Sequence, residues 1–160
     1  MVDFDTAMPI YQQLSNYSED LLYRAVGDEL AKTIGAAAAF AVEGSRIDVA
    51  DIEVTTDDDD DLESVAIVIL TADRLVAISH EAAGVVKTII RSRAAIRSVE
   101  LLKVPNVLAD RNWGRNGSLA VRITLTTGEM YELGDHDPTA KMQEDLRAAL
   151  PTLLGGLAAL

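Results

Sequence analysis

The chain has 160 residues, of which 49% are hydrophobic and 25% charged, and its formal net charge is −12 at pH 7. This length predicts one hydrophobic core, and the composition is too apolar for a disordered chain. The absence of cysteine excludes disulfides, thiolate metal sites and cysteine nucleophiles, and it is typical of a cytoplasmic protein. No secretory signal is expected. The longest apolar run, residues 35–42, is far shorter than the roughly 20 residues of a membrane span, so we expect no integral membrane protein.

The first part of the chain is predicted to be helical. Apolar residues three or four positions apart begin at Ile10, and a break near Asn16 divides the pattern into two helices. Ser18, which precedes two acidic residues, has the features of a helix N-cap. Gly44 ends the helical region, because glycine adopts a left-handed cap at little cost. We therefore predict a helical N-terminal extension over residues 1–44.

Beyond Gly44 the apolar period shortens to two residues, which predicts strands. The first covers residues 46–56, with a bulge at Ala50 and Asp51, and it precedes five consecutive aspartates at residues 57–61. Because adjacent like charges repel each other and favour water, the aspartates predict an exposed hairpin turn. Further strands are predicted over residues 64–71, 74–80, 85–92, 96–104, 118–126 and 130–133.

One amphipathic helix closes the chain. Asp137 and Pro138 combine an N-cap with a proline at the first helical position. Pro151 is expected to kink or end this helix, and the two glycines at residues 155 and 156 are expected to terminate it. Its apolar face consists of Met142, Leu146, Ala149 and Leu150.

Short motifs accompany this order of elements. Residues 70–75 read Leu-Thr-Ala-Asp-Arg-Leu, and residues 96–99 read Ile-Arg-Ser-Val. A hairpin pattern follows at Gly117, Val121, Ile123 and Gly128, before the Asp-Pro pair of the last helix. In the order and spacing of these motifs, residues 46–154 resemble bacterial pleckstrin-homology-like (PH-like) domains.

The resemblance implies an α+β fold in which N-terminal helices precede a seven-stranded antiparallel sheet or partly open barrel, closed by a C-terminal helix. It divides the chain into the extension at residues 1–44 and a PH-like domain at residues 45–160. It also implies a binding or assembly scaffold without catalysis, frequently oligomeric, although a fold alone does not fix a function.

Signals for catalysis or metal binding are absent from the sequence. His80 and His136 lie far apart and belong to no metal-binding pattern, so we expect no catalytic residue, metal or cofactor. The acidic run at residues 57–61 could attract a cation, but it lacks the spacing of an EF-hand loop. In lipid-binding PH-like domains the corresponding loop is basic, so five acids there argue against a phosphoinositide site.

Basic residues concentrate between positions 87 and 122, where eight basic and two acidic residues give a local charge of +6 against −18 for the remainder. This basic window could balance the acidic remainder, dock an acidic protein or a second copy, or bind phosphate. Trp113 could anchor a partner or cap the sheet. The candidate binding residues are Lys87, Arg91, Arg93, Arg97, Arg111, Trp113 and Arg115.

The sequence favours a protein-interaction or self-assembly module, whose partner is another protein or a second copy bound through the N-terminal helices. A module that binds anionic lipid or a phosphate ligand on the basic face is the alternative, and an acidic secretion-type chaperone is the third possibility. The strong negative charge argues against nucleic acid as a partner.

Overall fold

The computed structural model describes residues 4–18, 26–104, 118–135 and 139–158. In this part the helices are α1 (Phe4–Ser15), α3 (Asp28–Val42) and α4 (Ala140–Ala158). The strands form two antiparallel sheets. The four-stranded sheet contains β1 (Ile47–Thr56), β2 (Leu62–Thr71), β3 (Arg74–Glu81) and β4 (Lys87–Ser92). The three-stranded sheet contains β5 (Ile96–Lys103), β6 (Ala120–Leu125) and β7 (Met130–Leu133), and a 3₁₀ turn, η1 (Arg93–Ala95), joins the sheets.

This arrangement confirms the predicted α+β class, with antiparallel strands between N-terminal helices and a C-terminal helix. The strands lie within a few residues of their predicted positions, and the helical break near Asn16 is also confirmed. The two sheets do not join into a closed barrel. The bulge in β1 lies between Ile47 and Val49, so the prediction at Ala50 and Asp51 was wrong by about two residues. Asp137 and Pro138 lie outside the described residues.

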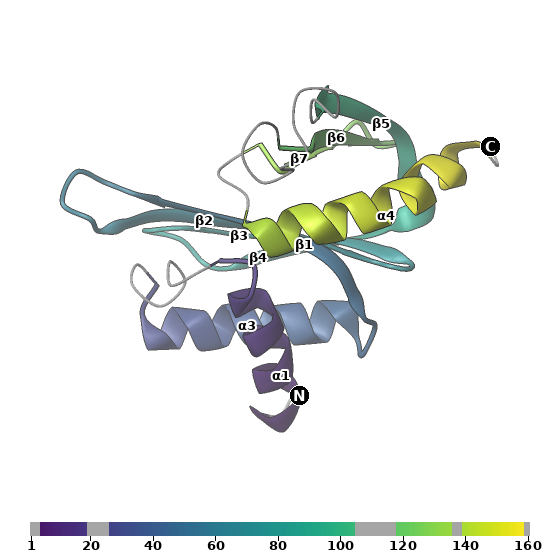
Figure 1. Cartoon of the computed structure of the whole chain (residues 1–160). Helices are drawn as coiled ribbons and strands as arrows, with labels where there is room; N and C mark the ends of the chain where they lie inside the picture. Colours follow the sequence, from purple (N-terminus) through teal and green to yellow (C-terminus); the bar gives the residue numbers. More distant parts are fainter. Residues whose placement is uncertain (1–3, 19–25, 105–117, 136–138, 159–160) are drawn as a thin grey trace.

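The four-stranded sheet is covered on both faces. In Figure 1, α1 and α3 lie below it, and α4 and the three-stranded sheet lie above it. The contacts agree with this view, since α3 packs on β3 and β4, and α4 packs on β1 and β5. Burial on both faces explains why β2 is almost continuously apolar where it lies deepest in the molecule.

Strand alternation identifies the face that the N-terminal helices cover. The Asp51 carboxylate of β1 accepts a hydrogen bond from the Gly134 N–H, at 2.8 Å, so its face is turned towards the three-stranded sheet. The opposite face carries the cross-strand pairs Ile67–Ile78 and Ile69–Val76, all of which are buried. The helical segment therefore has a structural role, because it shields an apolar sheet face from water.

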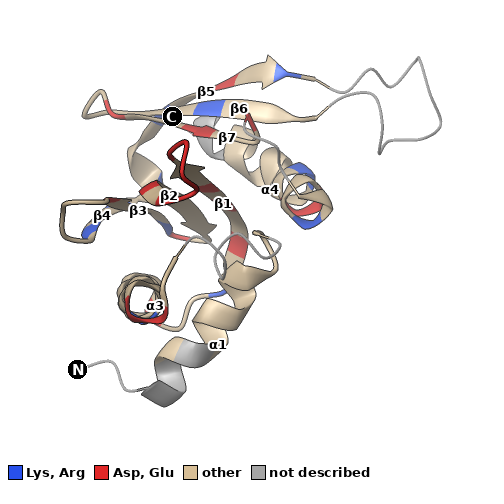
Figure 2. Cartoon of the chain, turned by 90° about the vertical axis from the view of Figure 1, so that its left-hand side faces the viewer, with Lys and Arg blue, Asp and Glu red and all other residues tan. Residues whose placement is uncertain are grey.

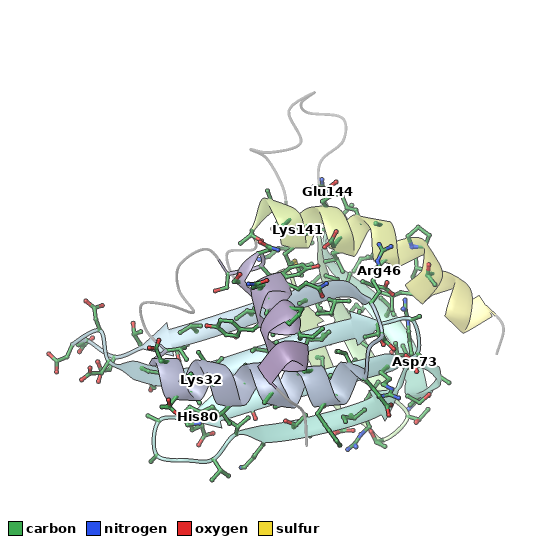
Figure 3. The ribbon with its side chains drawn as sticks, turned by 90° about the horizontal axis from the view of Figure 1, so that it is seen from below. Lys32, Arg46, Asp73, His80, Lys141 and Glu144 are labelled. Atoms are coloured by element: carbon green, nitrogen blue, oxygen red, sulfur yellow. The ribbon has the colours of Figure 1, made fainter. Side chains whose placement is uncertain are left out.

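The turn at residues 70–75 connects the sheet to the end of α3 through hydrogen bonds. The Thr71 hydroxyl accepts the Arg74 N–H at 3.1 Å and donates to Asp73 at 3.0 Å, which orders the turn between β2 and β3. The Arg74 guanidinium then donates to the Ala41 carbonyl oxygen at 2.9 Å and pairs with Glu43 at 2.5 Å. Arg74 thus satisfies a carbonyl in the last turn of α3, as expected for a basic residue at a helix C-terminus. Figure 3 shows α3 lying over the strands, with α1 crossing it.

The two N-terminal helices meet at a glycine. A Cβ atom added to Gly35 of α3 would lie 3.2 Å from the Cβ atom of Tyr11, so α1 and α3 approach closely at this point. Just after α1, the Tyr17 hydroxyl donates to the Asp145 carboxylate of α4, which also accepts from Lys141 at 2.8 Å. Burial and the neighbouring Asp145 raise the pKa of Tyr17 well above its usual value. These contacts connect the N-terminal helices with α4.

Helix α4 continues to Ala158, so Pro151 does not end it, and the expected end at the two glycines was wrong by two residues. Leu153 extends the buried stripe of Met142, Leu146 and Ala149, and burial of its side chain offsets the cost of the proline. Within the described residues, no helix has the length and apolarity that crossing a membrane requires.

Candidate functional site

The structure does not gather the predicted binding residues into one site. It describes four of them: Lys87 and Arg91 at the two ends of β4, Arg93 in η1, and Arg97 near the start of β5. Arg111, Trp113 and Arg115 lie outside the described residues. The described four must therefore be judged individually by their contacts.

Arg91 is engaged by a carboxylate of the other sheet. Its Nε and Nη2 atoms donate to the two oxygens of Glu129, at 2.8 and 3.0 Å, from β4 to the turn between β6 and β7. Thr127 also donates to Glu129, at 2.7 Å. These hydrogen bonds hold the pKa of Glu129 below its usual value. The bidentate pair joins the two sheets, and it already matches the charge of Arg91 with a carboxylate of this chain.

Arg93 is the most buried of the four cations. Its side chain is 10% exposed, and its Nη1 atom donates to the Asp48 carboxylate at 3.1 Å and to the Thr71 carbonyl oxygen at 2.7 Å. Its Nη2 atom is buried and has no hydrogen-bond partner in the described part of the chain. These contacts connect η1 with both β1 and β2.

Replacing Arg93 with alanine is expected to lower the free energy of unfolding by about 2 kcal/mol, because the half-buried Asp48 carboxylate keeps its charge and loses this partner. The matched variant Arg97→Ala removes an exposed arginine that forms no ion pair with a described residue, and its effect should stay within about 0.5 kcal/mol. Urea denaturation of the three proteins measures both. Equal losses would show that Arg93 has no special structural role.

The two remaining cations of the basic window that the structure describes are also paired with carboxylates of this chain. Lys103 pairs with Asp135 at 2.6 Å, and Arg122 pairs with Glu132 at 2.7 Å and with Glu100 at 3.0 Å. These pairs favour intramolecular balance, one of the three interpretations of the window. Within the described residues, Lys87 and Arg97 are its exposed cations without an ion pair.

The acidic run forms a compact turn at the tip of the β1–β2 hairpin, where it is red in Figure 2. The Asp57 carboxylate accepts the N–H groups of Asp59 and Asp61, at 2.9 and 3.0 Å, so it stabilises the turn itself. All five aspartates are exposed. Among the described residues, no three His, Asp or Glu side chains are placed to hold a metal ion together.

The structure reveals a feature that the sequence reasoning missed: an exposed apolar sheet edge. β4 is the last strand of its sheet, and its Ile89 and Ile90 side chains are each 37% exposed. Val85, just before the strand, is 75% exposed. We call residues 85–92 the β4 edge. The sequence predicted the strand at residues 85–92 but not its place at the edge of the sheet, because an apolar pair has the same pattern in a central strand and in an edge strand.

The backbone of the β4 edge also directs hydrogen-bonding groups away from its sheet, and one of them, the Ile90 carbonyl oxygen, accepts from Arg91 Nη1 at 3.4 Å. The Arg93 N–H donates to the Asp73 carbonyl oxygen at 2.7 Å, which fixes the hydrogen-bonded positions of the β3–β4 ladder. Since these positions alternate in antiparallel pairs, Ile89 and Arg91 bond to β3, whereas Thr88 and Ile90 direct their N–H and C=O groups outwards. No described strand pairs with that side of β4.

The comparisons with known proteins identify no relative. No protein-family model matches the chain, and no curated protein or solved structure matches it. The function must therefore be argued from the geometry and charge of the described surface.

Proposed function

We propose that this chain is a non-catalytic protein-interaction module built on a PH-like scaffold. The observation that carries the proposal is the β4 edge, where exposed apolar side chains flank outward backbone donors and acceptors. Exposed edges with these features are templates for pairing with another chain, and natural proteins usually protect them. A β4 edge left open on an otherwise charged protein therefore suits a surface that a partner covers.

The order of elements supports the PH-like scaffold. Four antiparallel strands are followed by three more, and α4 packs against a strand of each sheet. The resembling motif at residues 70–75 forms the turn between β2 and β3, and the motif at residues 96–99 opens β5. On this proposal the helices of residues 1–44 cover an outer face of the PH-like domain.

The contacts weigh against a phosphate-binding module. Arg91 and Arg93 bind carboxylates of this chain, and five exposed aspartates would repel a phosphate near the β1–β2 turn. Co-sedimentation with vesicles of anionic and of neutral lipid tests this alternative. The informative variant is Lys87→Glu with Arg97→Glu, because reversing the buried Arg93 would disrupt the fold.

The proposed function is tested by selecting binders of the folded protein from a displayed library of random peptides. We expect a set of peptides that bind saturably, and no binding to anionic vesicles. Sedimentation velocity on the unliganded protein, carried out alongside, distinguishes a partner-binding module from self-assembly. A library without binders, together with binding to anionic vesicles that is lost in Lys87→Glu with Arg97→Glu, would overturn the proposal in favour of the lipid module.

A further inference from the structure

We infer that the β4 edge accepts an extended acidic segment of a partner protein as a fifth strand of the four-stranded sheet. This inference rests on the proposed function and adds the site and the chemical class of the partner. It is carried by the regularity of the edge, by its side chains on both faces, and by its charge.

Among the described sheet edges, β4 is the one suited to strand addition. β1 and β5 are also edge strands, but each has two register shifts against its neighbour. β7 has four residues, too few to template a longer segment. β4 pairs with β3 over six consecutive positions without a shift and contains no proline. It therefore lacks the bulges, brevity and proline that often prevent edge pairing, and the exposed charge of Lys87 is its remaining protection.

An added strand would find apolar contacts on both faces of the sheet. Ile90 lies opposite Val76, on the face that α3 covers, whereas Ile89 lies opposite Ala77, on the face of Arg91. Neighbouring side chains on an incoming strand alternate between these two faces. The segment that fits should therefore contain at least two adjacent apolar residues, one to contact Ile89 and one to contact Ile90.

The charge around the β4 edge favours an acidic segment. Residues 82–99 contain four basic residues and no acidic one, but Glu129 and Asp48 pair with two of them, Arg91 and Arg93. Lys87, at the start of the strand, is exposed and has no ion pair with a described residue. A second copy is the less favourable occupant, because it brings no carboxylate in its own β4 edge to pair with Lys87 and would bring two strongly acidic proteins together. A segment with an acidic residue opposite Lys87 gains from pairing with that ammonium group.

The test uses the peptides selected from the random library and measures their affinity by fluorescence polarisation. Thr88→Pro removes an outward backbone donor and should weaken binding about tenfold or more, because one hydrogen bond is lost and the ring obstructs the pairing strand. Thr88→Val keeps the donor and should leave the affinity unchanged. Lys87→Glu should weaken binding, and the selected peptides should be enriched in Asp and Glu around an apolar centre.

Each contrary result has a defined meaning. Binders that tolerate both Thr88→Pro and Lys87→Glu would overturn the edge site and leave the proposed function intact. Neutral or basic binders would overturn the acidic partner. A dimer that Thr88→Pro dissociates would assign the edge to a second copy instead. If Thr88→Pro does not fold, peptides N-methylated at alternate amides are tested on the parent protein, and binding that survives methylation in both registers would overturn the proposal.

Discussion

Gly134→Ala is expected to lower the free energy of unfolding by about 4 kcal/mol, or to prevent folding. Gly134 follows β7 with a φ of +84°, and an added Cβ atom would lie 2.2 Å from the Leu119 carbonyl oxygen. Alanine therefore meets both the left-handed strain, of about 1 to 2 kcal/mol, and a steric clash with backbone. The clash falls at a junction, because Gln143 of α4 makes hydrogen bonds to both the N–H and the C=O of Leu119, at 2.7 and 2.9 Å.

Gly44→Ala is the matched control. Gly44 has a φ of +78°, but an added Cβ atom would meet no heavy atom within 4 Å. Gly44→Ala should therefore lower the free energy of unfolding only by the backbone strain, about 1 kcal/mol. Urea denaturation of both variants separates the two contributions, and equal losses would contradict the steric account of Gly134.

Removal of residues 1–42 is expected to abolish the folded monomer. The deletion uncovers the apolar face of the four-stranded sheet, whose buried residues include Val65, Ile67, Ile69, Val76 and Ile78. Burial of five such side chains contributes about 10 kcal/mol, which is comparable to the whole stability of a domain. Circular dichroism and size-exclusion chromatography of the truncated chain should show aggregation or loss of structure. A cooperative thermal transition with a monomeric elution volume would contradict this role of the helices.

This expectation changes how a partner role of the N-terminal helices must be tested. A truncated chain would expose its sheet, so its association would say nothing about a partner surface. Phe40→Ser is a suitable variant, because Phe40 lies on α3 and its side chain is 68% exposed. We expect it to leave the unfolding transition of the full chain nearly unchanged. A change in partner binding in that variant would implicate α3 directly.

The local elements of this fold could be predicted because local patterns determine them. The apolar alternation and the hairpin glycine at position 128 placed β7 at residues 130–133, where it is found. The helix end was misjudged because Pro151 is a strong local signal, whereas burial of Leu153 depends on tertiary packing. The sheet-covering role of α1 and α3 was missed for the same reason, since burial of both faces of β2 appears only once the layers are assembled.

The candidate site was harder to predict than the fold. In the sequence, Arg91 and Arg93 look free to bind a ligand, because their carboxylate partners lie 38 and 45 positions away. No local signal reveals such pairs. The apolar β4 edge was equally hidden, because only the order of strands in the sheet makes β4 an edge.

Residue-resolved amide hydrogen exchange along β4 tests the central claim most directly. The amides of Thr88 and Ile90 point outwards and should exchange rapidly in the free protein, whereas those of Ile89 and Arg91 should be protected by β3. A saturating selected peptide should then slow the exchange of Thr88 and Ile90. Protection that develops elsewhere, with Thr88 and Ile90 unchanged, would contradict strand addition at the β4 edge.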